Sequence, residues 1–199
     1  MAKAGKHGVT ENTPNNILFG AGTIHKDLAY TAGSGGTAGS WNFEDSIIGA
    51  TSGGSKLSIV PEFLDIEVDG ALVATKELKQ KIGETATLEI NFAEITKEIV
   101  KMATIGKDGT STDETYDLIE SKPLIETGDW LDNIAFVGQT LDGRKIIAIL
   151  ENALCTSGFE TEGKNKEGAV GAYTFTCHGD FTGDLDTLPW KIYFPKVSA

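Results

Sequence analysis

The segment ETATLEINF at residues 84–92 alternates between polar and apolar side chains, so that every second residue is apolar. This period of two indicates a half-buried β-strand, because successive side chains of a strand point to opposite faces of a sheet. Immediately afterwards, AEITKEIVKMA at 93–103 changes to helical spacing. We therefore expect a strand that leads into one helix at about 93–104, with Asn91 as its N-terminal cap.

Several other short segments carry apolar or alternating patterns that predict strands. They are residues 17–30, 64–78, 133–140, 144–150 and 172–181. Asp-Gly pairs predict hairpin turns at Asp69-Gly70 and Asp142-Gly143. These patterns predict about eight or nine strands. The predicted fold is mainly β, a β-sandwich or barrel-like body with one flanking α-helix and extended arms, in a single domain over residues 1–199.

Three stretches are predicted to extend from this body: an N-terminal arm at 1–16, a long flexible loop at 31–56 and a C-terminal arm at 182–199. The loop carries two glycine- and serine-rich tracts on either side of Trp41, and irregular segments of this length in compact domains are usually functional. Trp41 and Phe43 in the loop, like the aromatic residues of the C-terminal arm, are large apolar groups. Two alternatives stand open for them: burial against another subunit, or folding back onto their own domain.

The glycine-rich stretch GATSGGSK at residues 49–56 looks at first like a phosphate-binding loop. In such a loop, a lysine and a serine or threonine directly follow the second glycine, and a helix begins there. Here Lys56 comes one position late, and the alternating segment that follows contains Pro61, which disfavours a helix. We therefore expect no nucleotide site and interpret Gly53 and Gly54 as flexible loop residues.

The residue types that carry catalysis or bind metals are scarce. The chain has three histidines and two cysteines, and the neighbours Cys177 and His178 would point to opposite faces of a strand. The aspartates around residue 184 lack the ligand order of a calcium loop. We predict a non-enzymatic protein with no cofactor and no metal site. Cys155 and Cys177 are predicted to be buried free thiols, with a disulfide between them as the alternative.

The acidic charge argues against one class of function. The chain carries 29 acidic and 17 basic residues, a formal net charge of −12, and it has no basic stripe. Because neutralised phosphates supply most of the affinity for nucleic acid, tight binding of DNA or RNA is not expected. No signal peptide is predicted, since no apolar stretch follows the N-terminal lysines, and no apolar run is long enough to cross a membrane.

An ordered string of segments resembles the major tail tube proteins of long-tailed (siphovirus-type) bacteriophages of Gram-positive hosts. The segments are PNNILFGAGTIHKDL at 14–28, WNFEDSIIGATSGGSKLSIVPEFLDIEVDGALV at 41–73, ETATLEINFAEITKEIV at 84–100 and GDLDTLPWKIYFP at 183–195. The resemblance covers most of the chain, but it does not extend to residues 104–130 or 151–171.

The resemblance implies a structural protein that assembles into stacked, usually hexameric rings, whose channel conducts DNA during ejection. It implies that residues 31–56 are the inter-ring loop, with Gly33, Gly35, Gly36, Trp41, Phe43, Gly49, Gly53 and Gly54 as its marked residues. It implies contacts of the C-terminal arm through Trp190, Tyr193 and Phe194. A channel that repels phosphate would carry acidic residues. The candidates for that lining are Asp65, Glu67, Asp69 and Glu89.

The implied partners are further copies of the chain, a tape-measure protein, a tail terminator and tail tip proteins, with DNA only in non-specific transit and no membrane. The implied location is the virion, after synthesis in the host cytoplasm. Two alternatives remain. One is a tube protein of a contractile or type VI-like particle. The other is a β-sandwich module that binds a ligand such as a carbohydrate.

Overall fold

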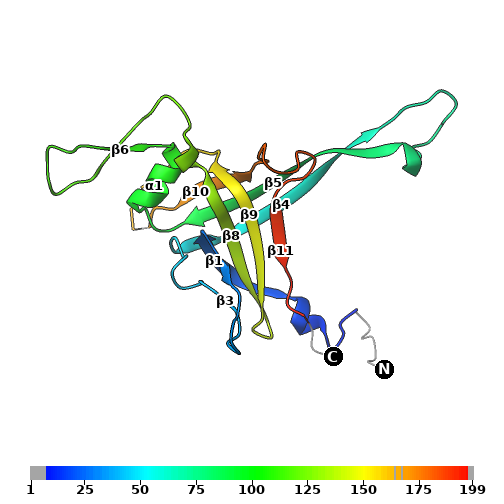
Figure 1. Ribbon diagram of the computed structural model, residues 1–199, viewed down its shortest axis with the longest axis horizontal. Coiled ribbons are helices and arrows are strands. Elements are labelled where there is room, and N and C mark those ends of the chain that lie inside the picture. The colour runs from blue at the N-terminus through cyan, green and yellow to red at the C-terminus, as the bar shows by residue number, and fades with distance from the viewer. Residues whose placement is uncertain (1–7, 164, 167, 197–199) are drawn as a thin grey trace.

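The computed structural model describes residues 8–163, 165–166 and 168–196, and these form a mainly β protein with one α-helix (Figure 1). The main antiparallel sheet has seven strands: β1 (Leu18–Lys26), β4 (Thr51–Asp65), β5 (Lys79–Phe92), β8 (Leu131–Thr140), β9 (Lys145–Cys155), β10 (Gly171–Cys177) and β11 (Trp190–Tyr193). Their order is β1-β8-β9-β10-β5-β4, and β11 also pairs with β9. The predicted fold class, mainly β with a single α-helix, is confirmed.

The remaining elements are short. Two small sheets pair β2 (Tyr30–Thr31) with β3 (Ser40–Trp41) and β6 (Lys107–Gly109) with β7 (Leu118–Glu120). Helix α1 spans Lys97–Thr104, and the 3-10 helices are η1 (Thr13–Asn16), η2 (Lys76–Leu78) and η3 (Thr127–Asp129). The described residues contain no helix that is long and apolar enough to cross a membrane.

The main sheet closes on itself through the segment that precedes β4. Ile47 forms a bridge with His25 of β1, and the Lys26 amide donates to the Ser46 carbonyl at 2.8 Å. A few residues later, Thr51 pairs with Phe92 of β5. The chain from residue 46 into β4 therefore joins the first strand of the sheet to the last. The body is barrel-like, because this join removes part of the open edge that a flat sheet would expose.

The core lies inside this body and explains the alternation in the sequence. The inward residues of β5 and β10 are buried together: Ala86, Leu88, Ile90, Phe92, Tyr173, Phe175 and Cys177. A second cluster covers the opposite face of β8 and β9, with Val137, Ile147 and Ile149 packed against Trp41 and Phe43. Because β9 is buried on both faces over residues 146–150, that part of its sequence, IIAIL, is apolar without alternation. Cys155 and Cys177 are buried and free, as predicted.

The helix starts later than expected. Its N-terminal cap is Thr96, whose hydroxyl accepts a hydrogen bond from the Ile99 amide at 3.2 Å. The predicted cap, Asn91, was wrong: it belongs to β5 and donates from its side chain to the Gly54 carbonyl. The sheet thus runs on to Phe92, and the helix ends at Thr104, where the next residue, Ile105, caps it with a left-handed backbone of φ 52°.

One predicted hairpin turn is confirmed and the other was wrong. Gly143 has φ of +87° and closes the turn between β8 and β9, as Asp142-Gly143 predicted. At Asp69-Gly70 no two-residue turn joins two strands, because β4 ends at Asp65 and β5 begins at Lys79. The chain GATSGGSK enters β4 instead of a helix, which agrees with the rejection of a phosphate-binding loop.

A buried histidine holds the join of the barrel. His25 Nδ1 lies 2.8 Å from the Ser46 hydroxyl, and that hydroxyl donates its only hydrogen to the Asn42 carbonyl at 2.8 Å. His25 therefore donates from Nδ1 and accepts at Nε2 from the Thr23 hydroxyl, 2.7 Å away. Burial, and then the positive charge of Lys145, lower the pKa of His25 from 6.5 to about 4.

This environment predicts a specific loss of stability in acid. Unfolded His25 binds a proton below pH 6.5 and folded His25 only below about pH 4, so the folded state loses about 3 kcal/mol as the pH falls between these values. Urea unfolding at pH 7 and pH 4.5 measures this loss. The variant His25→Gln removes the titrating group and should lose less stability over the same interval. Equal losses in the two proteins would contradict the prediction.

Candidate assembly surface

The β4–β5 hairpin extends far beyond the body and is the most prominent feature of the molecule (Figure 1). We call residues 60–84 the projecting hairpin and residues 66–78 the hairpin tip. Apolar side chains on this hairpin are exposed: Val60, Phe63, Leu64, Ile66, Val68, Leu72, Val73 and Ile82. Leu72 and Val73 have exposed fractions of 97% and 78%. A contiguous group of exposed apolar side chains is typical of a surface that binds another protein.

One ion pair joins the two strands of the projecting hairpin. Lys79 pairs with Asp65 at 2.8 Å, and its ammonium group also lies 5.6 Å from the centre of the Phe63 ring. This pair is exposed, so it contributes little stability. A two-stranded hairpin with no third strand or helix behind it is marginal in water. The exposed part of the hairpin therefore depends on its buried root for order.

The C-terminal strand clamps that root. The Trp190 indole N–H donates to the Glu84 carboxylate, which also forms an ion pair with Lys81. Hydrogen bonds from Lys81 and then from Trp190 lower the pKa of Glu84. Lys191 pairs with Glu151 of β9, so β11 is fixed to the body while its tryptophan contacts the hairpin. Trp190 therefore links the root of the hairpin to β11 and, through β11, to the body.

The expectation of one flexible loop over residues 31–56 was wrong. Trp41 lies in β3, with its ring 5.3 Å from Tyr30 and 5.1 Å from Tyr193, and Phe43 lies under the ammonium group of Lys145. Both aromatic residues pack against their own domain, where they bury the apolar side chains on the second face of β8 and β9. Of the two alternatives left open for them, the structure favours this one.

The glycines of this region divide into two groups. Gly49 precedes β4, while Gly53 and Gly54 belong to β4 and have positive φ at its bulge. Gly33, Gly35 and Gly36 lie in the exposed turn between β2 and β3. Only that short turn fits the description of a projecting loop. Its role between rings stays a prediction.

The terminal arms are partly attached to the body. The predicted C-terminal arm, 182–199, contains β11, so Trp190 and Tyr193 belong to the main sheet while Phe194 is 70% exposed. At the other end, η1 is held by Arg144, which donates to the Asn15 carbonyl at 3.2 Å. The first seven residues and the last three lie outside the described residues.

The four acidic residues predicted to line a channel fall into two pairs. Asp65 and Glu89 are in strands, and each has a lysine partner, Lys79 and Lys56 respectively. Glu67 and Asp69 were wrongly placed on a strand face and lie instead in the hairpin tip. Neither has a hydrogen bond or ion pair among the described residues. The direction that all four face in an assembly stays a prediction.

The sequence held a signal for the projecting hairpin that pattern reasoning missed. Pro61 in an otherwise regular strand indicates an edge, since proline cannot donate to a neighbouring strand. In β4 the apolar residues continue past Pro61 on both faces, although no other part of the body covers them. An edge strand that stays apolar on both faces predicts an external partner.

The described residues contain no group of three or more histidine, cysteine or acidic side chains that could hold a metal ion. Neither a scan against models of protein families nor a search of curated proteins found a match to the chain. The structural features above therefore carry the functional argument.

The clamp predicts a local change when its donor is removed. In Trp190→Phe the ring still fills its place, but the indole N–H is lost, so we expect faster hydrogen exchange of amides 79–84 without global unfolding. Hydrogen exchange followed by mass spectrometry measures this, with Phe194→Leu as a control on an exposed neighbour. Unchanged exchange at the hairpin root in Trp190→Phe would show that the indole does not orient the hairpin.

Proposed function

We propose that this chain is a structural subunit of a bacteriophage tail tube, which self-assembles into stacked hexameric rings around a channel for DNA ejection. The observation that carries the proposal is a long hairpin with an exposed apolar tip, built on a small barrel-like body. The resemblance of the sequence to tail tube proteins supports the same function. Its location would be the virion tail.

The exposed strand edges also suit repeated association. Among the residues that the structure describes, most of β4 pairs with β5 on one side only, and β5 has no other strand partner before Thr87. Unpaired strand edges attract further strands, which monomeric proteins normally prevent. In a closed ring of identical subunits such edges can pair with one another, which leaves no free edge.

The charge of the chain suits a channel through which DNA passes without sticking. A net charge of −12 repels phosphate at long range. Lys56 of β4 is paired with Glu89 of β5 at 2.7 Å, so its positive charge is neutralised. The other partners of such a tube would be a tape-measure protein, a terminator and tip proteins.

A second candidate function rests on the aromatic cluster. Tyr30, Trp41 and Tyr193 pack together beside β9, and both tyrosines stay exposed. An exposed aromatic group with polar edges suits a carbohydrate-binding module. That function would leave the projecting hairpin unexplained. A glycan-binding screen separates the two candidate functions. Only a carbohydrate-binding module requires a stable monomer that binds a glycan and loses that binding in the variant Trp41→Ala.

The tail tube proposal predicts that the hairpin tip is essential for assembly but not for folding. We expect the purified protein to form rings or tubes in negative-stain electron microscopy across a concentration series. The double variant Leu72→Asp and Val73→Asp should remain monomeric by light scattering, with an unchanged circular dichroism spectrum, because two charges would be buried at the contact.

The control is Phe181→Asp, which changes an equally exposed apolar residue outside the hairpin. It should assemble like the natural protein. A natural protein that stays monomeric at every concentration would contradict the proposed function. Normal tubes from the double variant would contradict the role of the tip.

A further inference from the structure

Residues 107–120, which we call the β6–β7 arm, form a hairpin beside α1 and outside the main sheet (Figure 1). Its two strands pair only with each other, with Lys107 opposite Glu120. The structure describes every residue of the arm, and none of them is buried. A two-stranded hairpin that buries no apolar face is marginal in water. The position of the arm therefore depends on contacts at its surface.

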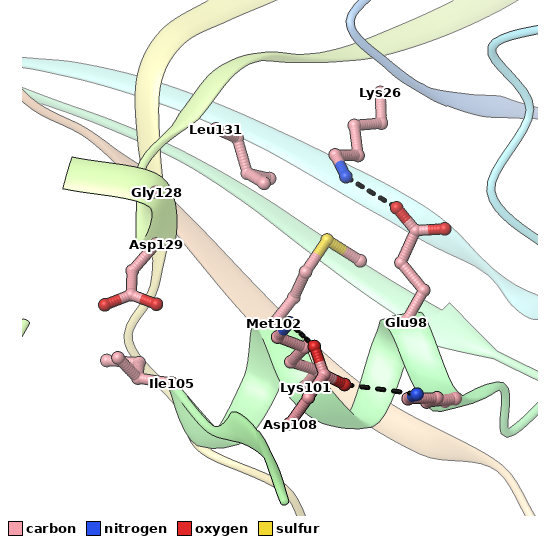
Figure 2. Close-up of a pocket in the computed structure, with 10 residues that line it drawn as sticks. Lys26, Glu98, Lys101, Met102, Ile105, Asp108, Gly128, Asp129 and Leu131 are labelled. Atoms are coloured by element: carbon pink, nitrogen blue, oxygen red, sulfur yellow. Dashed lines mark hydrogen bonds and ion pairs between the residues drawn. The ribbon is translucent and has the colours of Figure 1, made fainter. Parts of the chain in front are cut away.

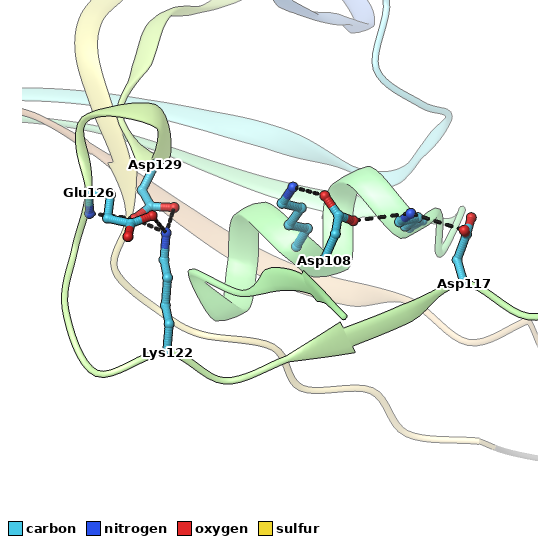
Figure 3. A network of polar contacts seen from close by, with 7 residues as sticks. Asp108, Asp117, Lys122, Glu126 and Asp129 are labelled. Carbon is cyan, nitrogen blue, oxygen red and sulfur yellow. Dashed lines mark hydrogen bonds and ion pairs between the residues drawn. The ribbon is translucent and has the colours of Figure 1, made fainter. Parts of the chain in front are cut away.

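Two lysines of α1 hold the arm against the helix. Lys101 pairs with Asp108 at 2.5 Å (Figure 2). Lys97 pairs with Asp108 at 3.1 Å and with Asp117 at 3.2 Å (Figure 3). We call these three ion pairs the latch. Because Asp108 lies in β6 and Asp117 directly precedes β7, the latch holds both strands of the arm.

The latch is exposed to solvent. The four side chains that form it have exposed fractions between 40% and 75%. Exposed ion pairs are weak and are screened by salt, since the Debye length falls from about 10 Å at 0.1 M to about 3 Å at 1 M ionic strength. The attachment of the arm to α1 is therefore sensitive to ionic strength.

The place of Lys97 in the helix gives it a particular need for the arm. Lys97 is the first residue of α1, directly after the cap Thr96. A positive side chain is unfavourable there, because the N-terminus of a helix carries a partial positive charge. The carboxylates of Asp108 and Asp117 offset this cost while the arm lies on the helix. Among the described residues Lys97 has no other ion-pair partner.

The base of the arm is fixed by contacts that salt affects less. Ile119 packs over Gly106, where a Cβ atom would come within 2.6 Å of the Ile119 Cγ2 atom. Directly after the arm, Lys122 pairs with Asp129 at 2.7 Å, and these side chains are only 8% and 9% exposed (Figure 3). Buried pairs are screened much less than exposed ones. The arm can therefore move while its base stays in place.

We propose that the β6–β7 arm is a movable element, which lies on α1 while the latch is formed and moves away from the helix when salt screens it. A cavity of about 410 Å³ between α1, η3 and β8 is affected, because Lys97, Lys101 and Asp108 all line it (Figure 2). Release of the arm leaves two ammonium groups without partners at this cavity. The inference concerns the single chain and does not depend on the proposed function.

The distance between two spin labels, measured by pulsed electron paramagnetic resonance on the monomeric full-length protein, tests the latch. One label is on Thr112→Cys in the exposed loop of the arm, and the other is on Gly128→Cys of η3, where a side chain meets no neighbouring atom. Cys155 and Cys177 are buried and should stay unlabelled. We expect one narrow distance distribution in about 0.1 M NaCl. In about 1 M NaCl the displaced population should grow roughly threefold to tenfold, the combined effect of a few exposed ion pairs.

Variants of the doubly labelled protein separate the latch from a general effect of salt. Lys97→Gln removes two of the three pairs and should displace the arm already in about 0.1 M NaCl, whereas Lys97→Arg should keep it docked. The control Lys56→Gln breaks an exposed ion pair on β4 and should leave the distribution narrow. An arm that keeps its distance both in about 1 M NaCl and in Lys97→Gln would overturn the proposal. A broad distribution at the lower salt concentration with Lys97 in place would overturn it as well.

Discussion

The pairing of β4 with β5 is the interaction on which the rest of the molecule depends. Its inner half, with Leu57 opposite Leu88 and Ile59 opposite Ala86, forms one wall of the core. Its outer half leaves the body and exposes apolar residues to water. One continuous ladder therefore joins the stability of the fold to the surface proposed for assembly. A substitution at the root of the hairpin should therefore change the order of the tip, although the residues of the tip stay the same.

The buried pairs also explain why the turn at Asp69-Gly70 does not join two paired strands. A two-residue turn there would have placed Leu57 opposite Ile82 instead of Leu88. That register would have removed Leu88 from the core, and register follows the buried face of a strand. The turn therefore forms only locally, within the exposed tip of residues 66–78, and does not set the register of β4 and β5. The register of the two strands is thus set by the buried pair of Leu57 and Leu88, and not by the turn.

The same distinction separates the predictions that held from those that did not. Alternation in 84–92 and the Asp142-Gly143 turn are local patterns, and both appear in the structure. The position of Trp41 depends on β8 and β9, which lie about a hundred residues away, and glycine content alone suggested a free loop. The cavity beside α1 joins three elements that sequence spacing does not bring together. Pro61 marks β4 as an edge strand, and the apolar residues that follow it belong to the projecting hairpin. The sequence does not show that no other part of the body covers those residues, so the hairpin could not be identified from it.

Hydrogen exchange of residues 60–84, compared between monomeric and assembled fractions of the natural protein, tests the central claim most directly. If the projecting hairpin is the assembly surface, its amides should exchange quickly in the monomer and become protected in the assembly, while those of the barrel core change little. Assembled particles in which these residues exchange as fast as in the monomer would contradict the account.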